Sequence, residues 1–351
     1  MSWLNDLFGS SNGAGSASAA QSPRSAPSAA APDLQVVRRA HVPSPELDAF
    51  MGTPEDPNWV RGRSAPSVET DAVRAGLVVT LASIHEECAP GERDLVAALM
   101  ASLELGDLGL PPFPDTVIEL RRLLDSDRVD SAEVSRLVRS DPGLAEEIWR
   151  VSSSVAHGGK RPPTLQAGII RLGHQQLWKI AMYVALDEAL FRISGYEEEV
   201  LYLRKHGSQV ADLAEWLAPT RLAGDAWLAG LLHDSGKLLV CRQASELRVP
   251  SSSPILRTLI DRTHAGFGAM VANSWGLEGP AEAIAQHHGG GSPIADMVHC
   301  ADVAAHGASF ASRGLSAQSA LDTLKQFPEA VPDPIALLDK AITLVEQQSA
   351  A

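Results

Sequence analysis

Seven histidine and aspartate side chains in the second half of the sequence are of the types that bind metal ions. They occur in five short segments: His206 in YLRKHGSQV, His233 and Asp234 in AGLLHDSGK, His264 in LIDRTHAGFG, His287 and His288 in AIAQHHGGG, and Asp302 in MVHCADVAAH. Imidazole and carboxylate groups bind zinc, iron, manganese or nickel, and an adjacent His-Asp pair at a helix end can reach one ion. The structural alternative for such a pair is a helix-end hydrogen bond, so the hypothesis depends on the whole set.

The remaining histidines and the cysteines are not assigned to this site. A lone histidine in a helix is usually a core or surface side chain, and we interpret five in this way: His85, His157, His174, His299 and His306. The three cysteines are far apart and odd in number, so they predict neither a disulfide framework nor a zinc cluster. This cysteine usage is typical of the reducing cytoplasm, which is the localisation that we expect.

The elements that must position these residues are predicted to be helices. Asp130 precedes Glu133 at capping-box spacing, and Asp141 precedes Pro142 in the arrangement that begins a helix. Apolar residues recur at helical spacing after about Val68, whereas alternating strand patterns are scarce. Further helices are expected at 225–233, 255–275, 280–288, 293–306 and 333–347. The predicted fold class is therefore all-α.

Composition divides the chain into an arm and a folded body. Residues 1–66 are rich in Ser, Ala, Pro and Gly, which predicts a disordered arm, and residues 67–107 are expected to form an accessory helical segment. The arm carries 5 basic and 6 acidic side chains, so −13 of the net charge of −14 falls on the body. Such an acidic body disfavours nucleic acid as a partner. No apolar run is long enough for a transmembrane segment.

The order of these residues resembles the H…HD…D signature of the HD metal phosphohydrolases. The segments LAGLLHDSGKLLV and HAGFGAMVANSWGLEGPAEAIAQHH resemble more specifically the HDOD domain family (HD-related output domain) and the related HD-GYP phosphodiesterases. Upstream, LPPFPDTVIELRRLL, LVRSDPGLAEEIWRVSSS and TLQAGIIRLGHQQLWKI are also similar to HDOD sequence. The resemblance covers residues 108–310, divided into an N-terminal helical half, 108–198, and an HD-like half, 199–310. Residues 311–351 are expected to form a C-terminal helical extension.

The resemblance implies a multi-helix HD-type bundle that acts in bacterial signalling. It implies a first site for a divalent ion (Fe, Mn, Zn, Ni or Mg) at four residues: His206, His233, Asp234 and Asp302. The additional histidines of two-metal relatives are matched by three more: His264, His287 and His288. Lys237 matches a lysine that meets a substrate phosphate, so Asp234 and Lys237 would be the catalytic residues of an active enzyme.

Three departures from the patterns of these families argue against cleavage of a cyclic dinucleotide. Only 13 residues separate His288 from Asp302, too few for the longer HD-GYP segment. Tyr202 stands one turn before the first histidine, where some HD-GYP proteins have an acidic ligand. Ser153 occupies a position where HDOD sequences are expected to have asparagine.

Two functional hypotheses follow from the resemblance and its departures. The favoured one is a signalling module that binds a protein partner or a nucleotide-type ligand and has an HD-type metal site. The alternative is a metal-dependent phosphohydrolase that acts on a nucleotide or cyclic nucleotide through a metal-bound hydroxide. A bound metal is compatible with both hypotheses, whereas turnover of substrate separates them.

Overall fold

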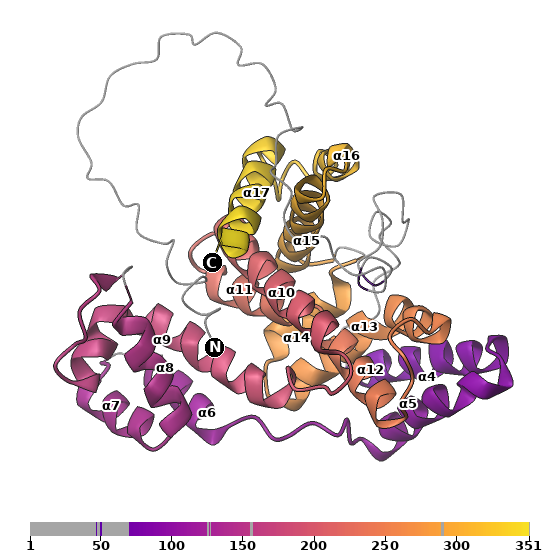
Figure 1. Cartoon of the computed structure of the whole chain (residues 1–351), viewed down its shortest axis with the longest axis horizontal. Coiled ribbons are helices and arrows are strands. Elements are labelled where there is room, and N and C mark those ends of the chain that lie inside the picture. The colour runs from indigo at the N-terminus through magenta and orange to yellow at the C-terminus, as the bar shows by residue number, and fades with distance from the viewer. Residues whose placement is uncertain are drawn as a thin grey trace, which may run out of the picture. The chain divides into compact units, whose positions relative to one another are not determined.

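Every regular element in the described part of the chain is a helix (Figure 1). The computed structural model describes residues 70–124, 126, 128–154, 157–288 and 291–350, together with Leu47 and Phe50. The predicted all-α fold class is confirmed. The predicted disordered arm, 1–66, lies outside the described residues apart from these two positions. None of the described helices is long and apolar enough to cross a membrane.

The described helices form two compact units, each of which is considered by itself. The smaller unit, residues 114–184, contains α6 (Asp115–Leu124), α7 (Ser131–Arg139), α8 (Pro142–Ser152) and most of α9 (Leu165–Ala189). The larger unit consists of residues 70–113 and 185–349. It contains α4 (Thr70–Glu87), η1 (Pro90–Glu92), α5 (Arg93–Leu105), α10 (Glu197–Leu217), α11 (Ala223–Leu232), α12 (Ser235–Glu246), α13 (Pro254–Ser274), α14 (Glu278–Gln286), α15 (Pro293–Ser312), α16 (Gln318–Leu324) and α17 (Pro334–Ala350).

Two helices of the smaller unit, α7 and α8, begin at the capping residues that the sequence predicts. The Asp130 carboxylate accepts a hydrogen bond from the backbone N–H of Ala132 at the start of α7. The Asp141 carboxylate accepts one from the N–H of Leu144 at the start of α8. Each carboxylate satisfies an N–H that has no partner within its helix. The starts of these helices are therefore set by short-range chemistry.

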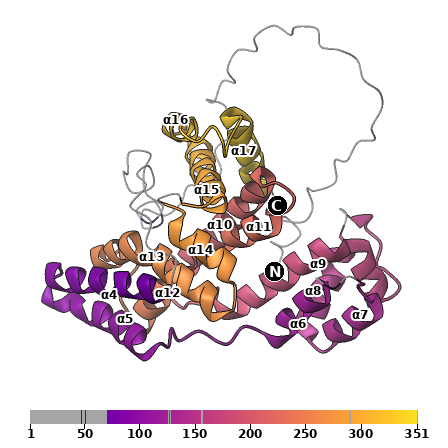
Figure 2. The same ribbon diagram turned by 180° about the vertical axis from the view of Figure 1, so that it is seen from behind.

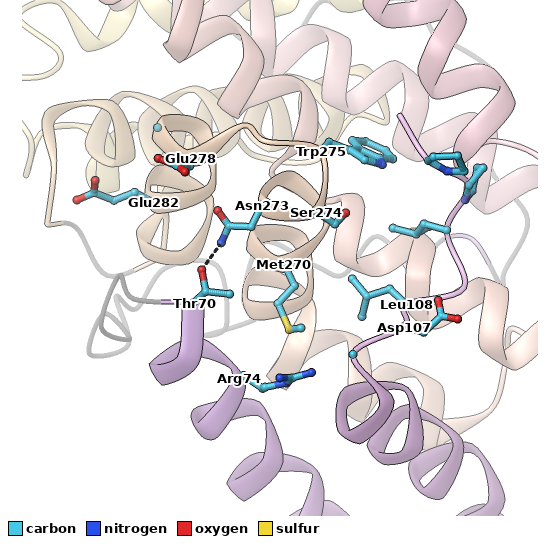
Figure 3. Close-up of a pocket in the computed structure, with 15 residues that line it drawn as sticks. Thr70, Arg74, Asp107, Leu108, Met270, Asn273, Ser274, Trp275, Glu278 and Glu282 are labelled. Carbon is cyan, nitrogen blue, oxygen red and sulfur yellow. Dashed lines mark hydrogen bonds between the residues drawn. The ribbon is translucent and has the colours of Figure 1, made fainter. Parts of the chain in front are cut away.

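The helices of residues 199–310, the predicted HD-like half, belong to the larger unit (Figure 2). Helix α10 packs against α11 and α15, α12 packs against α13, and α13 packs against α14. The accessory pair α4 and α5 belongs to the same unit, because α4 packs along α13 and α5 contacts α12. A cavity of about 880 Å³ opens between the accessory pair and the α13–α14 corner (Figure 3).

Two glycines allow the helices that carry the candidate ligands to approach closely. A side chain at Gly236 in α12 would lie 2.0 Å from the backbone oxygen of His264 in α13, closer than any real contact. A side chain at Gly207 in α10 would lie 3.0 Å from the backbone oxygen of Leu231 in α11. Glycine is therefore required at the α12–α13 contact, and this close approach places Asp234 beside His264.

Candidate metal centre

The seven residues singled out in the sequence converge in the larger unit. They come from α10 (His206), the joint between α11 and α12 (His233 and Asp234), α13 (His264), the end of α14 (His287 and His288) and α15 (Asp302). We call these seven residues the His/Asp cluster. None of them lies apart from the others, although they span almost 100 residues of sequence.

Two carboxylates form the centre of the cluster. The Nε2 atom of His206 lies 2.9 Å from Asp302 Oδ1 and 3.8 Å from Asp234 Oδ2. The Nε2 atom of His233 lies 3.4 Å from Asp234 Oδ2 and 3.7 Å from Asp302 Oδ1. Two imidazole nitrogens and two carboxylates thus face one another, which is a donor set suited to a borderline divalent ion.

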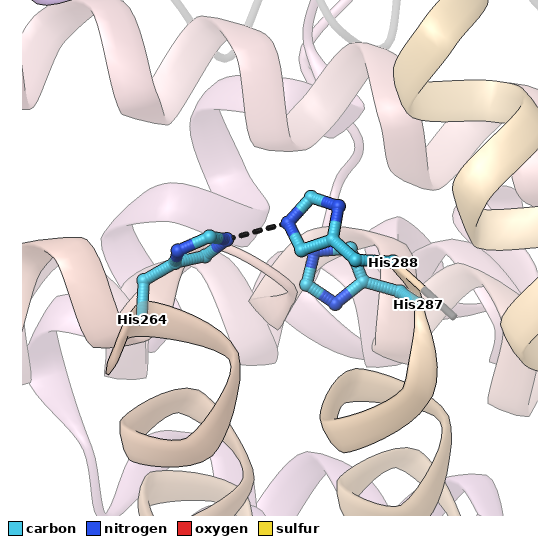
Figure 4. Close-up of side chains that lie close together, drawn as sticks. All are labelled: His264, His287 and His288. Atoms are coloured by element: carbon cyan, nitrogen blue, oxygen red, sulfur yellow. Dashed lines mark hydrogen bonds between the residues drawn. The ribbon is translucent and has the colours of Figure 1, made fainter. Parts of the chain in front are cut away.

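Three further histidines adjoin this centre (Figure 4). His264 Nε2 lies 2.7 Å from His288 Nε2, and the His287 ring centroid lies 3.9 Å from that of His288. The group is continuous with the carboxylates, because His264 Nε2 is 3.9 Å from Asp234 Oδ1 and the rings of His287 and His233 are 5.3 Å apart. The side chains can therefore form two adjacent groups of potential metal ligands.

Most of the cluster is buried. Six of its seven side chains are buried, with exposed fractions from 0% at His287 to 7% at His264, and only His288 is half-buried. Buried imidazoles and carboxylates lower the stability of a fold unless they are paired or bind an ion. This concentration of polar groups in a helical core therefore needs a compensating interaction.

Backbone contacts orient the histidine rings. His233 Nδ1 donates to the carbonyl of Gly230 at 2.8 Å, His264 Nδ1 to that of Ile260, and His287 Nδ1 to that of Ile284. A carbonyl oxygen only accepts, so the proton of each neutral ring is on Nδ1. Each Nε2 then presents its lone pair to the cluster, which is the arrangement usual for metal-ligating histidines.

Burial also keeps several of these rings unprotonated at neutral pH. It lowers the pKa of His206 to about 4, that of His264 to about 4 and that of His287 to about 3. At His233 burial acts in the same direction, but the charges of Asp234 and Asp302 outweigh it and raise the pKa. Burial alone would raise the pKa of the two carboxyl groups. The charges of His233 and Lys237 hold the pKa of Asp234 well below its usual range, and His306 together with the hydrogen bond from His206 does the same for Asp302.

The donor atoms fit a metal ion. Among the described residues, the buried Nε2 atoms of His233 and His287 have no hydrogen-bond partner. In the neutral ring of His233, this lone pair faces two carboxylates without an intervening proton. Negative charge facing a lone pair is unfavourable in a buried site unless a cation lies between them. Either a proton on His233 or a divalent ion would stabilise this arrangement. An ion would also give the buried Nε2 atom of His287 a partner.

Lys237 lies at the edge of the cluster on the first turn of α12. Its Nζ donates to Asp234 Oδ2 at 2.8 Å, and 18% of its side chain is exposed. Burial opposes its charged form, but Asp234 and Asp302 raise its pKa, so the ammonium is retained. The lysine is therefore bonded to a cluster carboxylate while its ammonium stays partly exposed to solvent.

His306 belongs to the site although the sequence reasoning gave it no role. Its Nδ1 lies 2.9 Å from Asp302 Oδ1, and its ring centroid is 4.5 Å from that of His206. Together with those two residues it forms a group that could hold an ion. The signal that could have found it is its spacing, because positions 302 and 306 share one face of α15 at i, i+4.

Replacing His306 with alanine is expected to weaken metal binding about 10- to 100-fold, the usual effect of removing a group that orients a ligand. The reason is that the Asp302 carboxylate loses a partner at 2.9 Å. Competition with a chelator of known affinity measures the change. His85→Ala is the control, since His85 is a half-buried histidine of α4 outside the candidate ligand groups. Equal affinities for the two variants would contradict a role for His306.

Comparison with known proteins identifies a family and a common fold. The family model of the HDOD domain matches residues 110–289. An uncharacterized protein of Treponema pallidum (strain Nichols) is 23% identical over 193 residues, which cover 51% of this chain and 37% of that protein. The chain thus spans a little over a third of the length of this relative.

Two solved structures share the helical architecture. An HDOD domain protein of unknown function from Geobacter sulfurreducens superimposes with a TM-score of 0.52 at 20% identity, covering 69% of this chain and 92% of that one. A protein of Shewanella amazonensis SB2B, provisionally named a metal-dependent phosphohydrolase, gives a TM-score of 0.52 at 18% identity, covering 74% of this chain and all of that one. At these identities the likeness establishes the fold.

Proposed function

Because this chain belongs to the HDOD family, we propose that it is a regulatory module of the bacterial cytoplasm whose His/Asp cluster holds a divalent metal ion. The module acts by binding a protein partner or a nucleotide-type ligand rather than by turning over a substrate. The ion stabilises the arrangement of five helical segments that meet at the cluster.

The burial of the ligand set carries this proposal. A hydrolytic metal centre keeps a coordination position open to water and substrate, whereas a structural centre is closed by protein ligands. Here the ligands on α10, α11, α13 and α15 are all less than a tenth exposed. The cavity of about 880 Å³ in this unit includes none of the cluster residues in its lining. Closure of this kind supports a stabilising ion over a catalytic one.

Each residue of the cluster has a defined task in this proposal. Four side chains would hold a first ion: His206, His233, Asp234 and Asp302. Three would complete a second position: His264, His287 and His288. When bound, a divalent ion supplies positive charge and Lewis acidity between the two carboxylates. The Nδ1 hydrogen bonds keep the Nε2 lone pairs of His233, His264 and His287 available, and Lys237 neutralises charge on Asp234.

The donor types favour a transition ion or zinc. The cluster contains five imidazoles and two carboxylates, and the buried thiols of Cys241 and Cys300 are not among its ligand groups. Imidazole suits Zn, Fe and Ni, whereas Mg²⁺ prefers oxygen ligands and retains several waters. A dry, histidine-rich site therefore selects against Mg²⁺.

A metal-dependent phosphohydrolase is the second candidate function. The observation that favours it is the complete His/Asp set beside Lys237, whose partly exposed ammonium could contact a phosphate. In that case Asp234 would hold the ion and orient Lys237, and the lysine would bind the substrate. The half-buried His288 marks the side from which a substrate would enter.

Two measurements on one preparation test the proposal. Elemental analysis of the protein purified without added metal is expected to give about one or more divalent ions per chain. A screen with bis(4-nitrophenyl) phosphate, a cyclic mononucleotide and cyclic dinucleotides is expected to show no turnover above that of Lys237→Ala. Hydrolysis that is lost in Lys237→Ala while the metal is retained would establish the hydrolase instead. Absence of metal even after loading would refute the metal centre.

A further inference from the structure

The cavity between the accessory pair and the α13–α14 corner lies outside the His/Asp cluster. Three segments enclose it: the start of α4, residues 106–112 after α5, and the turn from α13 to α14 (Figure 3). Its volume of about 880 Å³ is within the range of small-molecule sites. Both sides of the cavity belong to one compact unit, so its shape is a property of that unit.

Two hydrogen-bond donors of the cavity wall have no partner among the described residues. The Nε atom of Arg74 is buried and makes no hydrogen bond, and no ion pair joins this guanidinium to another described residue. The indole Nε1 of Trp275 is also buried and unpartnered, in a side chain that is only 6% exposed. Buried donors are nearly always paired in folded proteins, because an unpaired one lowers stability. A ligand acceptor bound at Arg74 would satisfy the first of these donors.

The other lining groups define the rest of the ligand. Met270 and Leu108 provide an apolar surface between Arg74 and Trp275. Three carboxylates also line the cavity: Asp107, which accepts a hydrogen bond from the N–H of Gly109, and Glu278 and Glu282 of α14, which lie away from Arg74 in Figure 3. An arginine accommodates one oxyanion with two parallel hydrogen bonds, whereas the distant carboxylates repel additional negative charge. The walls thus select a molecule with one anionic end and an apolar body.

We propose that this cavity binds a small organic molecule in which a single oxyanion, a carboxylate or a phosphate, pairs with Arg74 while an apolar body packs on Met270 and Trp275. The site requires no metal ion, so it stands independently of the His/Asp cluster. Its position is suited to regulation, because α13 carries both Met270 and His264. Occupancy of the cavity would also hold α4 against α13.

Binding of three probes to the full-length protein tests the site: benzoate, phenyl phosphate and the uncharged benzamide. They share a phenyl ring and differ in the group that meets Arg74. Titration calorimetry or ligand-observed NMR is expected to show millimolar binding of one or both anions and none of benzamide. Preference between benzoate and phenyl phosphate identifies the oxyanion. If neither anion binds at about 10 mM, ten times the expected dissociation constant, the proposal is wrong.

Four variants locate the binding. Arg74→Met should weaken the anion about 10-fold or more, since a hydrogen bond to a charged group is lost. Trp275→Phe should weaken it by a smaller factor, and Glu282→Gln should strengthen it by removing a repulsive charge. Arg93→Met, at an exposed arginine of α5 outside the cavity lining, is the matched control and should change nothing. Anion binding that survives Arg74→Met would place the anion elsewhere, the metal cluster included, and refute the site.

Discussion

Asp234→Asn is expected to lose most of the bound metal and about 3–5 kcal/mol of the free energy of unfolding, while the far-ultraviolet circular dichroism stays close to that of the wild type. The substitution keeps the volume of the side chain but removes a carboxylate that lies 2.8 Å from Lys237 Nζ and within 4 Å of three histidines. Removing one partner from a buried charge pair leaves the other uncompensated, which accounts for that magnitude. Elemental analysis and urea unfolding measure the two effects.

The chain offers a matched control for this substitution. Asp322 also bonds a lysine three residues later, with Asp322 Oδ1 and Lys325 Nζ 2.9 Å apart. Both side chains of this pair are more than half exposed. Exposed pairs of this kind contribute little to stability, so Asp322→Asn should leave metal content and unfolding unchanged. If Asp234→Asn and Asp322→Asn behaved alike, Asp234 would not hold the ion.

Acidification of the metal-free protein from pH 7 to pH 5 is expected to lower its free energy of unfolding steeply. Burial lowers the pKa of His206 and His264 to about 4 and that of His287 to about 3, whereas a histidine of the unfolded chain titrates near 6.5. Between these values the unfolded state binds more protons, so stability is present above pH 6.5 and is lost as the pH falls toward 4. Each of these three histidines changes the free energy of unfolding by at most about 1.4 kcal/mol per pH unit.

His233 acts in the opposite direction. Its pKa is raised in the folded state, so its contribution is present below pH 6.5 and is lost as the pH rises through the folded value. The effect of His233 on stability therefore cancels that of one of the three histidines whose pKa is lowered, but not that of all three. Urea unfolding in the presence of a chelator at several pH values gives the slope. The slope of the unfolding free energy against pH reports the difference in bound protons between the unfolded and folded states. His264→Gln should reduce that difference by up to about one proton. An unchanged slope would show that His264 is not buried in neutral form.

Local patterns in the sequence were sufficient to predict the helical fold. Asp130 and Asp141 begin α7 and α8 as predicted, because a cap is an interaction between residues two or three positions apart. The helix expected at 293–306 extends to Ser312, since the additional residues continue the apolar packing of α15 without a stop signal until Gly314. Helix ends are the least certain part of such a prediction because several neighbouring ends have similar energies.

The sequence by itself determined the all-α class, the helices that carry the candidate ligands and the chemical types of those ligands. Only the tertiary structure decided that His206 lies 2.9 Å from Asp302, that His306 joins them, and that Arg74 faces a cavity beside α13. Capping and periodicity depend on residues within one or two turns, so the sequence displays them directly. Contacts across 96 positions, as between His206 and Asp302, depend on how helices pack, and that packing rests on close approaches such as the one at Gly236.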